Sequence, residues 1–297
     1  MKVIDIRLKK NQFDISPSHV LIGSMGFIQK LKERVKVKRL LVLFIFCYIG
    51  LVIFGWFAAD KMIFVPSEKY GPLSGEVTLN SEQEKLTAVW LENPKAQHVI
   101  LFSHGNAENL EQNMFYFKLM RREGFSVFAY DYRGYGRSTG KPTEQGTYRD
   151  IEAAYRYLTK TLKIDPKRII IHGRSVGTGP STWLASKHPV GGLILESPFT
   201  SSFRVVIPVI PVIGDKFPNL RRIRKVSCPL LVIHGEVDDA IPIAHGRKVF
   251  ARHPGPKMSY WVPRAGHNDI LQWSGEAYWN TMHKFEKLVD ESQSRPR

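Results

Sequence analysis

The chain has 297 residues, of which 43% are hydrophobic and 24% are charged, a globular composition that excludes a mostly disordered chain, a collagen-like chain and a multi-span transporter. Its two cysteines exclude a disulfide scaffold and a cysteine-based zinc finger. The 43 Lys and Arg residues against 27 Asp and Glu give a net charge of +16, which leaves three readings open: nucleic acid as a partner, an anionic membrane surface as a partner, or no specific partner.

Residues 40–59 form a run of 20 residues without a charged side chain. At about 1.5 Å per residue, a helix of this length spans the roughly 30 Å hydrocarbon core of a bilayer, and it lacks the polar stripe of a soluble helix. The bulky Trp56 and Phe57 precede Ala58, where a signal-peptide cleavage site would carry small residues. We therefore expect a transmembrane signal anchor over 40–59, rather than a cleaved signal peptide or a buried core helix.

The charges that flank this run predict its orientation. Residues 1–39 hold ten Lys and Arg and three acidic residues, a net charge of +7, whereas the other flank opens with Asp60 and Lys61. The positive-inside rule places such a basic tail in the cytoplasm and residues 60–297 on the non-cytoplasmic side. Because no nucleic-acid-binding motif accompanies the remaining charge, we expect membrane lipid and no nucleic acid as a partner, and we infer no obligate protein partner.

After the anchor, short apolar runs alternate with longer helix-like stretches, a pattern typical of βαβ units with a mostly parallel sheet. It predicts one α/β domain over 60–297, with helices on both faces of the sheet. A preceding pair of runs predicts an antiparallel hairpin at the edge of the sheet. The predicted strands are 76–80, 85–91, 98–103, 126–130, 168–172, 192–196, 230–234 and 258–262, and the predicted helices are 109–122, 148–162, 176–187, 244–252 and 276–289.

The segment 200–229 leaves room only for a small lid or connector. Within it, the run 205–213 is continuously apolar and contains two prolines, so that it is either a wall for an acyl chain or a packed connector. The basic run 221–225 is interpreted as a solvated face, with contact to anionic lipid headgroups as the alternative.

A nucleophile motif follows the predicted strand 168–172. Gly173, Ser175 and Gly177 fit the G-x-S-x-G pattern between a strand and a helix. The glycines are needed because a serine in so tight a turn has no room for neighbouring Cβ atoms. The pattern predicts that Ser175 is a nucleophile exposed at the carboxyl edge of the sheet.

A serine nucleophile needs a base and an orienting acid. His267 lies in the loop after the last predicted strand, and Asp238 lies just past the strand 230–234, so that the chain order is Ser, Asp, His, as in α/β-hydrolases. Asp239 and Glu196 are the rival acids. Other histidines at strand ends, His104, His172 and His234, are interpreted as hydrogen-bonded turn residues.

The oxyanion of an acyl-transfer reaction needs two N–H donors. One is expected to be the amide of Val176, which follows the nucleophile. The other is expected from the turn after the strand 98–103, as the amide of Asn106 or Ala107.

Together, the motifs HGNAEN, DYRGYGRS, GRSVGTG, ESPFTS and HGEVDDAIP resemble membrane-anchored alpha/beta-hydrolase-domain proteins related to the fission-yeast Bem family. The resemblance covers about residues 60–290 and extends to the anchor. It implies an α/β-hydrolase fold, catalytic roles for Ser175, Asp238 and His267, and a structural role for the loop 131–138. Relatives include depalmitoylases, lysophospholipases and serine peptidases, so the substrate is left open.

These observations predict a membrane-anchored serine hydrolase that cleaves an ester or thioester, with an acyl or lipid substrate. A peptidase with the same triad is one alternative, and a non-catalytic, membrane-tethered interaction protein is another. No H-E-x-x-H motif or Cys/His cluster is present in the sequence, so we expect neither a metal nor another cofactor.

Overall fold

The computed structural model describes the backbone of residues 17–206 and 214–294, and the side chains of the same residues except those at 17–31, 51, 52, 54–59 and 206. The chain divides into two compact units, residues 1–54 and residues 55–297. Helix α1 (Pro17–Ile63) contains the whole of the predicted anchor 40–59.

Among the residues described, no helix proves to be both long enough and apolar enough to cross a membrane. The predicted anchor includes undescribed side chains, at 51, 52 and 54–59. A helix over 40–59 is therefore found, whereas its transmembrane character is not supported by the structure and stays a prediction.

The second unit is built on an eight-stranded sheet with the strand order β1-β2-β4-β3-β5-β6-β7-β8. Strands β3 to β8 run parallel to one another, and the hairpin β1–β2 pairs antiparallel with β4 at one edge, as predicted. The bounds of the strands are β1 (Glu76–Ser81), β2 (Glu84–Leu91), β3 (Val99–Ser103), β4 (Ser126–Tyr130), β5 (Ile169–Arg174), β6 (Gly192–Glu196), β7 (Leu230–Gly235) and β8 (Lys257–Val262).

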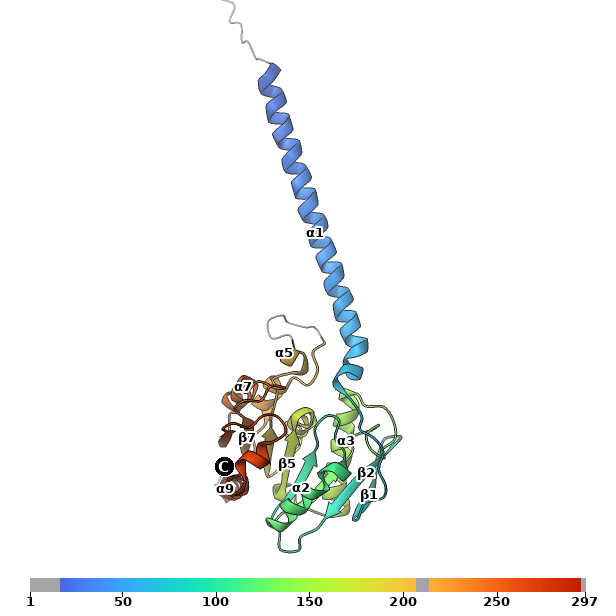
Figure 1. Cartoon of the computed structure of the whole chain (residues 1–297), viewed down its shortest axis with the longest axis vertical. Coiled ribbons are helices and arrows are strands. Elements are labelled where there is room, and N and C mark those ends of the chain that lie inside the picture. Colours follow the sequence, from blue (N-terminus) through green and yellow to red (C-terminus); the bar gives the residue numbers. More distant parts are fainter. Residues whose placement is uncertain (1–16, 207–213, 295–297) are drawn as a thin grey trace, which may run out of the picture. The chain divides into compact units, whose positions relative to one another are not determined.

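Helices cover both faces of this sheet (Figure 1). Along β3, Leu101 faces one apolar cluster, whereas Ile100 and Phe102 face a second one, because side chains alternate along a strand. The first cluster holds buried residues of α3 (Glu144–Arg156), α4 (Thr178–Ala185) and α7 (Ala244–Arg252), and the second those of α2 (Leu110–Arg122) and α9 (Glu276–Ser294). The carboxyl ends of the parallel strands thus meet at one edge.

Four of the five predicted helices have different bounds, although those of α2, expected at 109–122, and of α4, expected at 176–187, differ by only one or two residues at an end. The helix expected at 148–162 begins at Glu144, because the Thr143 hydroxyl caps its first turn by accepting the Gly146 amide at 2.9 Å. Its α-helical part ends at Arg156 and continues as one π-helical turn, η1 (Tyr157–Thr161). The last helix, expected to end at residue 289, extends to Ser294.

In the described residues of the connector, 200–206 and 214–229, the helical pieces are short, as its length suggested. These are α5 (Ser202–Val206), α6 (Asn219–Arg222) and the 3-10 turn η4 (Ile223–Lys225). Most of the apolar run 205–213 lies outside the described residues, so the acyl-wall hypothesis stays a prediction.

Candidate active site

The turn that carries Ser175 has the geometry of a nucleophile elbow. Strand β5 ends at Arg174, the 3-10 turn η3 (Ser175–Gly177) follows, and α4 begins at Thr178. Ser175 has φ +52°, in the left-handed region that non-glycine residues rarely adopt. A Cβ at residue 177 would lie 2.1 Å from the Ser103 carbonyl oxygen, so glycine is required there. The chain thus accepts local strain at its predicted nucleophile.

The three predicted triad residues lie together at the carboxyl edge of the sheet. His267, in the loop after β8, has its Nε2 3.0 Å from the Ser175 hydroxyl oxygen. Its Nδ1 is 2.8 Å from the Asp238 carboxylate, which follows β7. This arrangement favours a tautomer in which Nδ1–H donates to Asp238 and Nε2 accepts from Ser175.

Asp238 is held as a carboxylate by several donors. The Ile241 amide donates to Oδ1 at 2.7 Å, the Ser197 hydroxyl donates to Oδ2 at 2.8 Å, and His234 Nε2 lies 3.3 Å from Oδ2. Burial by itself would raise the pKa of Asp238. Hydrogen bonds from His234, His267 and the Ile241 amide outweigh this effect and hold the pKa well below its usual value.

The rival acids occupy other places. Asp239 is exposed, and none of its contacts joins it to His267 among the residues described. Glu196 is buried and accepts a hydrogen bond from the Tyr278 hydroxyl at 2.8 Å, with His172 Nε2 at 3.4 Å. Neither carboxylate contacts the candidate base, so the geometry favours Asp238.

His234 is the site residue whose position the sequence did not indicate. Expected to be a hydrogen-bonded turn residue, it does form a hydrogen bond with the Ile241 carbonyl at 2.8 Å, but it also lies directly behind the triad carboxylate. The sequence could have indicated this position, because His234 lies four residues before Asp238, with the end of β7 between them.

The turn that follows β3 has two amides free for an oxyanion. The Gly105 amide donates to the Glu108 carboxylate at 3.0 Å. Over the described parts of the chain, the amides of Asn106 and Ala107 form no hydrogen bond, and Ala107 has φ +57°. Both predicted candidates for the second oxyanion donor therefore remain, beside the amide of Val176.

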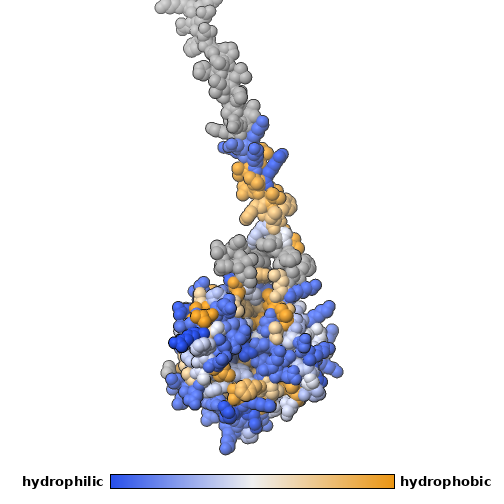
Figure 2. All heavy atoms as spheres, in the orientation of Figure 1, coloured by the Kyte–Doolittle hydropathy of each residue, from blue (hydrophilic) through white to orange (hydrophobic). Residues whose placement is uncertain are grey.

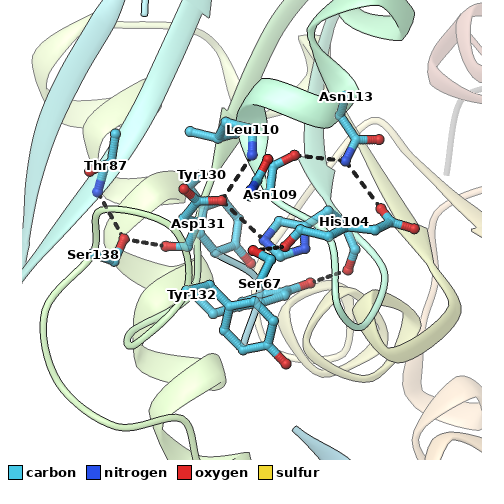
Figure 3. A network of polar contacts seen from close by, with 12 residues as sticks. Ser67, Thr87, His104, Asn109, Leu110, Asn113, Tyr130, Asp131, Tyr132 and Ser138 are labelled. Atoms are coloured by element: carbon cyan, nitrogen blue, oxygen red, sulfur yellow. Dashed lines mark hydrogen bonds and ion pairs between the residues drawn. The ribbon is translucent and has the colours of Figure 1, made fainter. Parts of the chain in front are cut away.

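A network of polar contacts holds the turn that follows β3 (Figure 3). The Asp131 carboxylate accepts from the Leu110 amide at 3.0 Å and lies 3.4 Å from His104 Nε2. The Tyr132 hydroxyl donates to the His104 carbonyl at 2.7 Å, and the Ser138 hydroxyl donates to the Asp131 carbonyl at 2.9 Å. The loop 131–138 thus supports the oxyanion turn, in agreement with the structural role that the resemblance implied.

A segment that follows α1 also supports the oxyanion turn. We call residues 63–70 the strap. The Asn106 side chain accepts from the Val65 amide at 2.9 Å and donates to the Ile63 carbonyl at 2.7 Å. No motif in the sequence predicted a role for this segment.

Further contacts fasten the strap along its length. The Ser67 hydroxyl donates to the Glu108 carbonyl at 3.1 Å, and the Asn109 side chain donates to the Glu68 carbonyl at 3.2 Å. The Tyr70 hydroxyl donates to the Asp131 carboxylate, which joins the strap to the network of Figure 3. In the sequence, the only indication that this turn contacts the strap was the pair Asn106 and Asn109, three residues apart.

A cavity of about 310 Å³ adjoins the candidate base. The Arg174 guanidinium, next to the nucleophile, pairs in it with the Glu108 carboxylate and donates to the Asn113 side chain at 2.9 Å. Burial would raise the pKa of Glu108, but the Arg174 guanidinium, His104 and the hydrogen bond from the Gly105 amide together outweigh burial and lower that pKa. The cavity thus combines charged, polar and apolar groups, and it is lined by Glu108, Gln112, Asn113, Phe115, Tyr116, Arg174, Glu196, His267, Asn268, Ile270, Leu271 and Tyr278.

Two solved structures have a fold similar to that of this chain. The chain is similar to the esterase Pf2001 of Pyrococcus furiosus, with a TM-score of 0.63 and 20% identity over 75% of this chain and 98% of that one. It is also similar to an alpha-beta hydrolase from Vibrio vulnificus, with a TM-score of 0.58 and 24% identity over 71% and 80% of the two chains. At these identities the likeness shows the fold alone.

Sequence comparison gives the family. The family model of the alpha/beta hydrolase fold matches residues 98–222. The human alpha/beta hydrolase domain-containing protein 17B is 39% identical over 219 residues, which are 72% of this chain and 74% of the relative. A protein of the same name from Xenopus laevis is 41% identical over 66% of this chain and 67% of its own length. By this identity and coverage, the chain belongs to the alpha/beta hydrolase domain-containing proteins.

Proposed function

We propose that this protein is a serine hydrolase that cleaves esters or thioesters of acyl groups through Ser175, His267 and Asp238. One observation carries the proposal. The Ser175 hydroxyl, on a left-handed turn at the carboxyl edge of the sheet, lies 3.0 Å from a histidine whose other nitrogen is 2.8 Å from a carboxylate. An activated serine nucleophile needs this chain of contacts.

In the proposed reaction, His267 Nε2 takes the proton of the Ser175 hydroxyl as its oxygen attacks the substrate carbonyl carbon. The amides of Val176 and of Asn106 or Ala107 stabilise the oxyanion that forms. The tetrahedral intermediate collapses, the bond to the alcohol or thiol breaks, and His267 returns the proton to that leaving group. Water, deprotonated by His267, then attacks the acyl-enzyme and releases the acid.

The names of the relatives and neighbours agree with hydrolase chemistry, since they include alpha/beta hydrolase domain-containing proteins and an esterase. The cavity beside His267 offers the charged side chains of Arg174 and Glu108 among apolar ones, and these two charges suit a polar leaving group better than a long acyl chain. We therefore place the polar part of the substrate in this cavity.

We also propose that residues 40–59 anchor the protein in a membrane, with the hydrolase domain on the non-cytoplasmic side. The charge-free sequence of this range supports the anchor, and so do its large exposed side chains between residues 40 and 46 (Figure 2). A reporter fused to the carboxyl terminus, active only outside the cytoplasm, tests the orientation. A cytoplasmic signal from that reporter would overturn it.

The triad is tested by labelling the full chain with a fluorophosphonate probe, which reacts with activated serines. We expect labelling of the natural protein and none of the Ser175→Ala variant, because the attacking oxygen is missing. Ser181→Ala is the matched control, since it removes a buried hydroxyl from the neighbouring helix α4. Labelling that persists in Ser175→Ala, or that is absent from the natural protein, would refute the serine-hydrolase proposal.

A further inference from the structure

A second and larger cavity, of about 620 Å³, lies between the connector that follows β6 and helix α7. None of the triad residues lines it. We call it the basic pocket, because its charged lining consists of one carboxylate and five cationic side chains, namely Asp215 against Arg204, Arg221, Arg224, Lys248 and Arg252.

The single carboxylate of the basic pocket is already engaged. Asp215 accepts a hydrogen bond from the Phe203 amide at 2.9 Å and so holds the start of α5. Elsewhere in the domain, arginines pair closely with carboxylates, as Arg133 does with Asp150 at 2.8 Å. In the described ranges 17–206 and 214–294, no such ion pair is formed by Arg221, Arg224, Lys248 or Arg252.

The connector and α7 place the cationic side chains of the basic pocket around one cavity. Arg222, in the middle of the basic run 221–225, is used elsewhere: its guanidinium lies 4.5 Å from the centre of the Tyr148 ring and donates to the hydroxyl of that residue. This contact fixes α6, and Arg221 and Arg224, three residues apart, line the pocket together. Lys248 and Arg252, four residues apart on α7, line it from the other side.

The basic pocket also contains neutral hydrogen-bond donors. The Thr200 amide donates to His245 Nδ1 at 3.2 Å, so that nitrogen is an acceptor and the hydrogen of a neutral ring is on Nε2. Burial and the neighbouring Lys248 lower the pKa of His245, which keeps the ring neutral. The Ser201 hydroxyl lines the same cavity. Guanidinium forks with nearby N–H and O–H donors are the groups that bind phosphate oxygens well.

We propose that the basic pocket is a binding site for a phosphate monoester, separate from the catalytic centre. A dianion matches an excess of cations better than a carboxylate does, and the cavity is roomy enough for the group that carries the phosphate. The same chemistry is offered by a soluble phosphate ester and by the headgroup of phosphatidic acid.

The test uses the full chain in detergent with Ser175→Ala, so that no lipid ester is cleaved. Isothermal titration calorimetry at constant ionic strength measures the binding of inorganic phosphate and of dioctanoyl phosphatidic acid, with dioctanoyl phosphatidylcholine as the neutral reference. We expect one saturable site for the phosphate monoester. Replacing two arginines, Arg221→Gln with Arg224→Gln, is expected to weaken binding about ten-fold or more, because charge-assisted hydrogen bonds are lost.

The matched control removes the same charge elsewhere, by Arg156→Gln with Lys160→Gln at the carboxyl end of α3 and in η1. It is expected to bind phosphate as the parent does. Stronger binding of phosphatidic acid than of phosphate, lost in the pocket variant, would identify a lipid headgroup. Equal binding of the two would identify soluble phosphate esters. The absence of saturable binding, or an equal loss in both variants, would overturn the proposal.

A third variant separates loss of binding from loss of folding. Lys248→Gln with Arg252→Gln changes the opposite wall of the basic pocket and should weaken phosphate binding in the same way. With Ser175 restored, both pocket variants should still react with a fluorophosphonate, because they do not touch the triad. If labelling fails in the natural protein while phosphate binding survives, the proposed hydrolase function is wrong and the basic pocket stands.

Discussion

Asp238, the acid of the proposed triad, owes its position to two residues that do not belong to the triad. Ser197 is held at φ +48° directly after β6, and its hydroxyl reaches across to the Asp238 carboxylate at 2.8 Å. From behind, His234 approaches the same oxygen at 3.3 Å. Because this oxygen also accepts the hydrogen bond that His267 Nδ1–H donates, both residues influence how firmly the base is oriented. We regard Ser197 as a positioning residue.

Replacing Ser197 with alanine should therefore lower kcat by about ten-fold and leave KM nearly unchanged, because a hydrogen bond to a charged group contributes about 1.5–3 kcal/mol. Steady-state hydrolysis of a short-chain ester gives both constants. Ser292→Ala, which removes a hydroxyl that bonds within α9, is the control. An equal effect of the two substitutions on kcat would contradict the positioning role.

At the scale of elements, the oxyanion turn is supported on two sides, by the loop 131–138 and by the strap. At Ile63, Val65 and Glu68 the strap contributes backbone groups, and its side-chain contacts, from Ser67 and Tyr70, follow no pattern that the sequence reveals. Its partner Asn106 makes a third contact, accepting from the Tyr135 hydroxyl at 2.6 Å. This asparagine side chain joins both supports directly beneath a candidate oxyanion donor.

The Asn106→Ala variant keeps the backbone amide but loses these three contacts. We expect kcat to fall by about ten-fold, with a small change in KM, because an oxyanion donor acts on the transition state. Asn93→Ala is a matched control, since the Asn93 side chain also ties a loop, with bonds to Arg121 and Lys95. If KM rises and kcat is unchanged, the strap supports substrate binding instead.

The sequence predicts the bounds of an element well where one short apolar run corresponds to one strand or one helix. The strands 126–130 and 192–196 and the helix 244–252 have the predicted bounds, and the three residues predicted from the order Ser175, Asp238, His267 lie within hydrogen-bond distance of one another in turn. It fails where the contact is made by backbone atoms, as at the strap. The sequence also does not predict contacts between residues that approach each other only after folding, such as His234 and the Asp238 carboxylate behind which it lies. The start of α3 was missed for a similar reason, because the hydrogen bond by which Thr143 caps the helix forms only on folding.

At the scale of the whole molecule, buried titratable groups couple stability to pH. Burial lowers the pKa of His253, which is 2% exposed, and Lys257 lowers it further. The unfolded chain therefore binds a proton at this residue more readily than the folded one. The stability that depends on neutral His253 is present above about pH 6.5 and is lost as the pH falls below it.

We accordingly expect a lower Tm at pH 5.5 than at pH 7.5, at constant ionic strength. In His253→Gln the difference between the two pH values should shrink, whatever the variant's absolute stability, because one titrating group is gone. Thermal unfolding followed by circular dichroism measures this. A difference as large as that of the natural protein would show that other groups, such as His245, cause the pH dependence.

The strap also decides where a working catalytic unit begins. The first strand starts at Glu76, and the family match starts at residue 98, so a boundary drawn from either would leave Asn106 and Asn109 without their partners. A protease that cuts before Ile63 would release a fragment that keeps both supports of the turn, whereas a cut after Glu68 would remove the strap contacts of Asn106 and Asn109 and leave the turn supported mainly by the loop 131–138. The two cuts lie only a few residues apart, yet they would leave fragments with differently supported turns.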